Sequence, residues 1–328
     1  MEGMHRRDFL KKSSLLTLGL LAAPEKLFSS SSLDDAISLN EAVSLSEDQK
    51  IVVNLPGYEL KLFNYQDGKI AREYKFTVGV GKGRYWRHPT PITTGRVVDK
   101  RPWIHFFFEN DKPERGAKIG DVITETWTFD GQGNPVKYPM PYEKMRGLGT
   151  LMRMPSGYMN PGFVIHSTTD EFTLGAATSN GCIRLGMEDM LKLYELVAPD
   201  AKQKGGPKQP IPLKYPVPIQ TLYELVEIKD SRVVIHRDIY DKGIDYVDEF
   251  KKQLAASDWL KELTGDDALS MFDYDLIKKE FAGAQEQFKE AHRDILLKLF
   301  KPFPDNYISP EMRQKLHKAY SIADLMRK

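Results

Sequence analysis

The chain is organised around two short stretches, Ile165-His166-Ser167-Thr168-Thr169 and Ser179-Asn180-Gly181-Cys182-Ile183-Arg184-Leu185. Cys182 is the only cysteine among 328 residues, so it cannot form an intramolecular disulfide. His166 lies 16 positions earlier (182 − 166), a separation that suits two neighbouring strands joined by a loop. We therefore expect folding to bring this thiol and this imidazole together.

The residue types around Cys182 favour nucleophilic chemistry. A thiol attacks as its thiolate, which is scarce at neutral pH because a free cysteine has a pKa of about 8.5. A neighbouring imidazole can take that proton. Gly181 permits a tight turn before the nucleophile, so that nearby backbone amides can face a developing oxyanion. The alternative role for Cys182 is that of a small buried hydrophobic residue.

The two stretches resemble the signature of the L,D-transpeptidase catalytic domain family, also called YkuD-type. That signature is a His, about fifteen residues, and then Ser-His-Gly-Cys-x-Arg/Asn. Four positions match, namely Ser179, Gly181, Cys182 and Arg184. Asn180 stands where the family usually has His, but the resemblance implies that the base is the upstream His166. It also implies that the carbonyl of Ser167 orients the imidazole and that amides near Gly181 hold the oxyanion.

The resemblance further implies a substrate, the peptide stems of peptidoglycan, as both donor and acceptor. The thiolate would attack the carbonyl before a terminal D-alanine, and an amine of a second stem would resolve the thioester. Arg184 shares a strand face with Cys182, and its planar fork suits a substrate carboxylate. A surface ion pair is the alternative for Arg184. Ser179, Asn180 and Tyr158 are further candidates for substrate binding.

Two other functions remain open at this point. The first is a thiol-dependent L,D-carboxypeptidase or amidase, in which water resolves the thioester on murein stems. The second is a non-catalytic wall-binding protein, suggested by Asn180 and by the extra helices at the C-terminus. The residues themselves do not decide between them, because no acceptor pocket is marked in the sequence.

Composition and motifs argue against several other classes of protein. The chain is 41% hydrophobic and 28% charged with a net charge of +1, which is typical of a globular protein and not of a nucleic-acid binder. Its seven His are scattered, and neither His-Glu-x-x-His nor a Cys pair occurs, so we expect no metal site. We found no Walker-type loop and no Gly-x-Ser-x-Gly motif, and we expect no cofactor.

Residues 1–30 are predicted to be an export signal. Arg6-Arg7-x-Phe9-Leu10-Lys11 precedes a short apolar run, and the pattern resembles a twin-arginine signal. We therefore expect passage through the twin-arginine export machinery to the periplasm or cell envelope. A single cysteine suits an oxidising compartment, because a second cysteine there could form a disulfide with the first. The alternative is that residues 1–30 form an amphipathic segment at the start of a cytosolic protein.

The predicted fold class is α+β, a mainly β, L,D-transpeptidase-like sandwich with a helical C-terminal extension. Alternating apolar and charged residues predict a hairpin over 51–63, and helical spacing predicts helices over 187–197 and 274–299. A further amphipathic helix is expected over 311–327. The predicted domains after the signal are a linker (31–49), the catalytic domain (50–200), a loop insertion with a late hairpin (201–243) and a helical region (244–328). The helices of that last region pack on the catalytic body or bind a wall or envelope partner.

Overall fold

The computed structural model describes residues 46–83, 89–107, 118–130, 134–202, 206–229, 231–257, 267–299, 301 and 304–327. The predicted export signal and residues 31–45 of the predicted linker lie outside these ranges. Within them, no helix is both long enough and apolar enough to cross a membrane.

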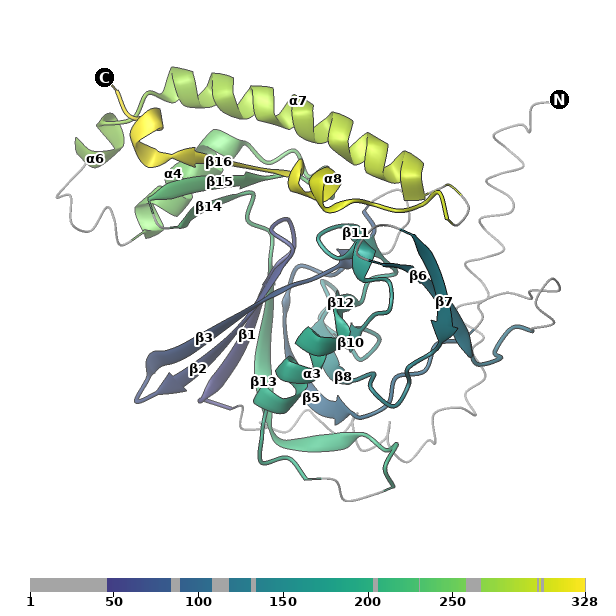
Figure 1. Cartoon of the computed structure of the whole chain (residues 1–328). Coiled ribbons are helices and arrows are strands. Elements are labelled where there is room, and N and C mark those ends of the chain that lie inside the picture. Colours follow the sequence, from purple (N-terminus) through teal and green to yellow (C-terminus); the bar gives the residue numbers. More distant parts are fainter. Residues whose placement is uncertain are drawn as a thin grey trace, which may run out of the picture. The chain divides into compact units, whose positions relative to one another are not determined.

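The described part of the chain is built on a nine-stranded sheet (Figure 1). Eight strands follow the order β12-β10-β8-β5-β13-β1-β2-β3, and β9 pairs with β8. Their bounds are β1 (Gln49–Asn54), β2 (Glu59–Gln66), β3 (Lys69–Thr77), β5 (Thr94–Arg101), β8 (Gly147–Arg153), β9 (Met159–Asn160), β10 (Val164–Ser167), β12 (Ile183–Leu185) and β13 (Ile211–Leu222). Two neighbouring pairs are parallel, β1 with β13 and β10 with β12.

The first hairpin forms as the alternation of its residues predicts. Leu60 and Leu62 of β2 are fully buried, whereas Lys61 between them stays partly exposed. Chain reversal after β1 is helped by Tyr58, which adopts a positive φ. The predicted α+β class is confirmed, because strands dominate the first two thirds of the chain and helices the last third.

β13 corrects the prediction of a loop insertion in the first part of residues 201–243. Residues 211–218 belong to a strand that lies between β1 and β5 in the main sheet. Pro212, Pro216 and Pro218 led to the error, since proline removes a backbone donor and rarely occupies an inner strand. The pairing of β13 with β5 shifts register between Pro212 and Val217, and Pro216 lies within this irregularity. Pro212 and Pro218 are paired with β5, opposite Asp99 and Arg96. The late hairpin was predicted correctly and comprises β14 (Val226–Lys229) and β15 (Arg232–His236).

Shorter elements surround the end of the sheet that carries β10 and β12. β4 (Val80–Gly81) pairs with β11 (Ala177–Ser179), and β6 (Glu125–Phe129) pairs with β7 (Pro135–Pro139). The helix predicted over 187–197 is α3 (Met187–Leu196), which follows β12 directly. Its first amide, that of Met187, donates to the carboxylate of Glu171 at 2.9 Å. Glu171 begins the short helix η4 (Glu171–Thr173), so one carboxylate joins the loop before Cys182 to the helix after it.

The C-terminal region has a small sheet of its own, β14-β15-β16, covered by helices. Its remaining elements are α4 (Tyr246–Ala256), α6 (Asp267–Ser270), α7 (Tyr274–Leu299), α8 (Pro310–Gln314), β16 (His317–Ser321) and η5 (Ile322–Leu325). The long helix was predicted correctly, but the single helix expected over 311–327 is wrong beyond α8, which ends at Gln314. β16 replaces it, because these residues pair with β15, a tertiary contact that helical spacing alone does not reveal.

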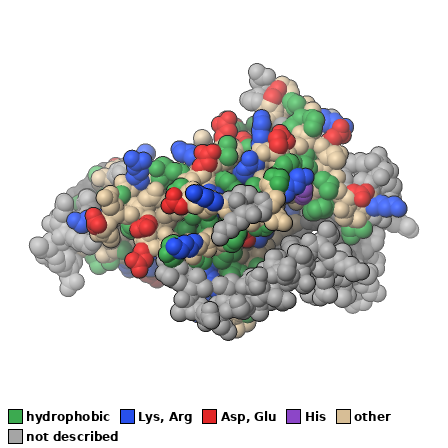
Figure 2. Space-filling model, turned by 90° about the horizontal axis from the view of Figure 1, so that it is seen from below, with side chains coloured by type: hydrophobic (Ala, Val, Ile, Leu, Met, Phe, Trp, Pro, Cys, Tyr) green, Lys and Arg blue, Asp and Glu red, His purple; other side chains and the backbone are tan. Residues whose placement is uncertain are grey.

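Helix α7 belongs to two hydrophobic cores. Ile277 and Phe281, near its beginning, pack with the C-terminal sheet. Ala291 and Ile295, near its end, pack with the residues of the main sheet, and Ile308 joins them there. The C-terminal region is therefore continuous with the main sheet through shared apolar contacts. On the face drawn in Figure 2, acidic and basic side chains of the described residues are interspersed.

We predict that Ile295→Ala lowers the free energy of unfolding by about 2–5 kcal/mol, because it empties a site in the core of the main sheet. Ile295 is 2% exposed, whereas Leu297 on the same helix is 58% exposed and provides the matched control. Leu297→Ala should change stability by less than about 0.5 kcal/mol. Urea unfolding followed by fluorescence and circular dichroism measures both. Equal effects of the two substitutions would contradict the shared core.

Candidate active site

The parallel pairing of β10 with β12 places the predicted catalytic residues next to each other. In this register His166 lies opposite Arg184, and Ile165 lies opposite Ile183. Cys182 immediately precedes β12, so it lies opposite Val164 at the start of β10. Because side chains alternate between the two faces of a strand, Cys182, His166 and Arg184 share one face. Ile165 and Ile183 point the other way, into the core.

A single backbone contact fixes the tautomer of His166. Its Nδ1 lies 2.8 Å from the carbonyl oxygen of Ser167. A carbonyl oxygen only accepts, so Nδ1 carries the hydrogen of the neutral ring and Nε2 keeps its lone pair. The ring of Phe106 packs edge-on against the imidazole, with 5.5 Å between centroids. His166 is buried and held in one orientation, with Nε2 as the nitrogen that can accept a proton.

Ser167 is hydrogen-bonded to Arg146, which directly precedes β8. Its hydroxyl donates to the carbonyl of Arg146 at 3.0 Å and accepts from the amide of Arg146 at 2.7 Å. The backbone amide of Ser167 also donates to the Arg146 carbonyl, at 3.0 Å. These contacts hold the peptide unit whose carbonyl faces His166.

Burial keeps both members of the pair uncharged. Desolvation lowers the pKa of His166 to about 4, and the positive charge of Arg184 acts in the same direction, against the opposing hydrogen bond to Ser167. Desolvation also raises the pKa of the Cys182 thiol, although a backbone hydrogen bond from Val164 and the charges of Arg184 and Arg101 lower it in part. At neutral pH the resting state is therefore a neutral imidazole beside a neutral thiol.

The turn before Cys182 is held by hydrogen bonds within the loop and by one from Thr90. Gly181 adopts a φ of +107°, which disfavours any residue with a side chain. The hydroxyl of Ser179 donates to the carbonyl of Cys182 at 2.5 Å and accepts from the amide of Gly181 at 3.1 Å. The hydroxyl of Thr90 donates to the carbonyl of Gly181 at 2.8 Å. The side chain of Ser179 is buried inside this loop, and the Gly181 amide already has an acceptor.

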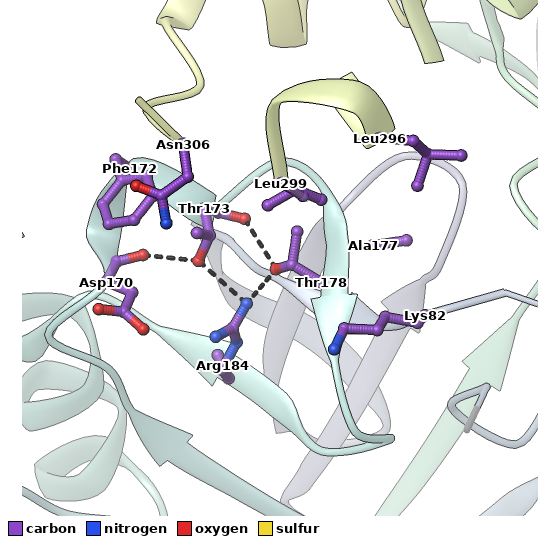
Figure 3. A pocket seen from close by; sticks show the side chains of 10 residues that line it. All are labelled: Lys82, Asp170, Phe172, Thr173, Ala177, Thr178, Arg184, Leu296, Leu299 and Asn306. Carbon is purple, nitrogen blue, oxygen red and sulfur yellow. Dashed lines mark hydrogen bonds between the residues drawn. The ribbon is translucent and has the colours of Figure 1, made fainter. Parts of the chain in front are cut away.

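Arg184 lies at the floor of a pocket and is only partly paired (Figure 3). Its Nη2 donates to the hydroxyl of Thr173 at 2.9 Å and to that of Thr178. Its Nε is buried and has no hydrogen-bond partner. Asp170 is near enough for its charge to raise the pKa of Arg184, against the lowering effect of burial. The surface ion pair considered for Arg184 is absent among the described residues.

Two further candidates lie on the surface. Asn180 is exposed, and the ammonium of Lys82 donates to its side-chain oxygen at 3.5 Å. Tyr158 is 57% exposed and lies just before β9, on the turn after β8. No contact that the structure records among the described residues links Tyr158 to Cys182. In the part of the chain that the structure describes, no group of three or more His, Cys, Asp or Glu has a metal-binding arrangement.

Comparison with known proteins identifies the family. The L,D-transpeptidase catalytic domain profile, YkuD, matches residues 48–235, more than half of the chain. The chain belongs to the L,D-transpeptidase catalytic domain family. The match extends beyond residue 200, the predicted end of the domain, and includes β13, in keeping with the place of this strand inside the main sheet.

Several solved structures are similar to parts of the chain. An L,D-transpeptidase from Xylanimonas cellulosilytica has 15% identity and a TM-score of 0.24, over 56% of this chain and 62% of that one. A fused Zn-dependent amidase/peptidase/peptidoglycan-binding protein from Clostridium acetobutylicum has 12% identity and a TM-score of 0.27, over 53% and 52%. The helical cell shape determining protein Pgp2 from Campylobacter jejuni has 17% identity and a TM-score of 0.26, over 57% and 53%. The chain thus spans between half and two thirds of these relatives' lengths. No curated protein matches it.

The sequence analysis missed three residues that lie near the candidate site. Arg101 at the end of β5 acts on the thiol through its charge, and Phe106 packs on His166. Asp170 lies near Arg184 in the loop between the two catalytic stretches. None belongs to a local motif, and the pairing of β5 with β8 that brings Arg101 to the site is a long-range contact. Of the three, only Asp170 could have been suspected from the sequence, because it is a carboxylate four residues after His166.

We predict that alkylation of Cys182 by iodoacetamide speeds up about tenfold per pH unit between pH 6 and 9, because the thiolate fraction rises in that proportion below a raised thiol pKa. The rate is measured by intact-mass spectrometry. The Cys182→Ala variant is a strict blank, since the chain has no other cysteine. A flat profile near neutral pH would reveal a preformed thiolate–imidazolium pair and would contradict the neutral resting state.

Proposed function

We propose that this protein is a peptidoglycan L,D-transpeptidase that joins peptide stems through a thioester on Cys182. The observation that supports this best is the arrangement of His166. Its Nδ1 is bound by the Ser167 carbonyl, its pKa lies at about 4, and it shares a strand face with the only cysteine. A neutral imidazole with Nε2 unprotonated is the form that a general base requires.

The first half-reaction forms the thioester. As Sγ of Cys182 attacks the stem carbonyl that precedes the terminal D-alanine, Nε2 of His166 takes the thiol proton. The amide of Gly181 already donates to Ser179, so we assign the amide of Cys182 as an oxyanion donor. When the tetrahedral intermediate collapses, the C–N bond breaks and His166 returns the proton to the leaving amine. D-alanine leaves, and the stem remains bound to sulfur.

The second half-reaction forms the cross-link. An amine of a second stem attacks the thioester carbonyl and gives a proton to Nε2 of His166. The C–S bond then breaks, and the departing thiolate takes that proton back, which restores the neutral pair. Acid–base help of this kind contributes about 10²–10⁴-fold to the rate. If water attacks instead of the amine, the same site performs the trimming reaction of a carboxypeptidase.

The electrostatics of the site suit proton transfer that accompanies attack. Burial disfavours both the thiolate and the imidazolium, so a standing ion pair is unfavourable. Arg101 and Arg184 each favour the anionic sulfur, and these charges stabilise it when substrate is present. The base is neutral above a pH of about 4, so its protonation limits turnover only in strongly acidic solution.

The proposed function also sets the expected location of the protein. Peptidoglycan lies outside the cytoplasmic membrane, so the enzyme must be exported. We propose that residues 1–30 address it to the twin-arginine machinery and that it acts in the periplasm or cell envelope. The twin-arginine-like residues Arg6 and Arg7 support this.

We predict that Cys182→Ala abolishes the formation of cross-linked dimers from purified tetrapeptide muropeptides, because no thioester can form. His166→Gln keeps a polar side chain of similar size but removes the nitrogen that accepts the proton, so it should lower the rate about 10²–10⁴-fold. Liquid chromatography with mass spectrometry measures dimers, released D-alanine and trimmed monomers. Thermal unfolding of each variant checks that the fold is kept.

The outcomes separate the three candidate functions. Dimers that depend on Cys182 support the transpeptidase. Trimmed monomers without dimers would replace it by the L,D-carboxypeptidase. Turnover that persists in Cys182→Ala would refute the role of the thiol, and no turnover in the unaltered protein would favour the wall-binding alternative.

A further inference from the structure

A basic side chain from the C-terminal region caps the short helix between β10 and β12. Nη1 of Arg313, on α8, donates to the backbone carbonyls of Glu171 at 3.3 Å, Phe172 at 2.8 Å and Leu174 at 3.0 Å. These carbonyls belong to η4 and to the residue after it. A helix leaves its last carbonyls without partners inside itself, and a cationic side chain can supply the donors. Arg313 lies beyond residue 235, where the match to the L,D-transpeptidase family ends.

The element that carries Arg313 is anchored on both sides. Ile308 precedes α8 and Leu316 follows it, and both are buried in the core of the main sheet. The hydroxyl of Ser309 accepts from the amide of Met312 at 3.4 Å and so caps the start of α8. Arg313 therefore holds η4 from a fixed position.

Helix η4 in turn holds the guanidinium of Arg184 (Figure 3). The hydroxyl of Thr173, the last residue of η4, accepts from Nη2 of Arg184 at 2.9 Å and donates to the carbonyl of Asp170 at 2.6 Å. Nη2 also donates to the hydroxyl of Thr178, which itself donates to the carbonyl of Thr173 at 3.4 Å. Among the described residues, both recorded acceptors of this guanidinium are thus fixed by η4.

The place of Arg184 affects the thiol directly. Arg184 lies two residues after Cys182, on the same strand face. Burial raises the pKa of the thiol, whereas a backbone hydrogen bond from Val164 and the charges of Arg184 and Arg101 lower it. If Arg184 moved away from the sulfur, the effect of burial would be less compensated and the thiolate would become scarcer.

Two other charged side chains line the cavity over Arg184. They are Lys82, a second cation, and the carboxylate of Asp170. Lys82 follows β4 and donates to the side chain of Asn180 at 3.5 Å, so a change in η4 leaves it in place. Asp170 directly precedes η4 and would move with it, whereas the thiol responds to the charge of Arg184. A looser η4 should therefore weaken the stabilisation of the thiolate.

We propose that Arg313 is a positioning residue of the candidate active site. It fixes η4 from the C-terminal region and, through Thr173, keeps the guanidinium of Arg184 beside Cys182. That this contact speeds thioester formation rests on the proposed function. The effect on the thiol itself does not, and it can be measured where no turnover occurs.

The ionisation of the thiol in the full-length protein tests this role. Cysteine labelled with ¹³C at Cβ gives one resonance, because Cys182 is the only cysteine, and its chemical shift against pH reports the thiolate. Arg313→Met removes the donors but keeps an unbranched apolar chain. We expect it to lower the thiolate fraction at neutral pH about threefold or more, because Arg184 is no longer held near the sulfur.

Two further substitutions at arginine positions provide the controls. Arg313→Lys keeps an ammonium that can donate to the same carbonyls, so it should restore most of the lost thiolate. Arg293→Met removes an equal charge from the exposed side of α7 and should leave the ionisation of the thiol unchanged. An equal effect of Arg293→Met and Arg313→Met would overturn the proposal, since it would show a general effect of net charge.

The route through Thr173 is tested by a double-mutant cycle. Thr173→Val keeps the shape of the side chain but removes the hydroxyl that joins η4 to Arg184, so it should reduce the thiolate as Arg313→Met does. The double variant should show no more than the larger single effect. Thermal unfolding identifies a variant that fails to fold, and the other one then decides. The proposal is overturned if Arg313→Met lowers the stability but leaves the ionisation of the thiol unchanged, or if the two effects add in full.

Discussion

The parallel pairing of β10 with β12 is the constraint on which the site depends. It places His166 opposite Arg184 and, through the alternation of side chains, directs Cys182 to the same face. A shift of one residue in either strand would turn one of these side chains into the core, where Ile165 and Ile183 now pack. Because both strands are short, their register depends on the surrounding contacts, such as those between Ser167 and Arg146.

The loop that joins the two strands is supported from outside the catalytic domain. Arg313, on α8, donates to the carbonyls at the end of η4, while Glu171 in the same short helix accepts from the first amide of α3. Helix α7 contributes Ile295 to the core of the main sheet. The C-terminal region therefore stabilises the segment between His166 and Cys182.

Local sequence patterns predicted the family and several of the helices and strands. The elements that they missed depend on pairing between distant parts of the chain. The motif around Cys182 and the remote His166 led to the correct family, and periodicity located α3 and α7. Prolines concealed β13, since a proline is rare in an inner strand, and the pairing of β13 with β1 and β5 is long-range. β16 was mistaken for a helix because its partner, β15, lies more than eighty positions earlier in the chain. Arg101 and Phe106 reach the candidate site only through the tertiary fold, so no spacing rule identifies them.

The protonation state of His166 is the quantity from which the mechanism follows. Nuclear magnetic resonance of the full chain labelled with ¹⁵N-histidine, titrated from pH 8 to pH 4 and assigned with the His166→Gln variant, measures it directly. The account predicts a neutral ring at pH 7 with the hydrogen on Nδ1, which begins to gain a second proton only as the pH approaches 4. A doubly protonated ring at pH 7, or a neutral ring with its hydrogen on Nε2, would contradict it.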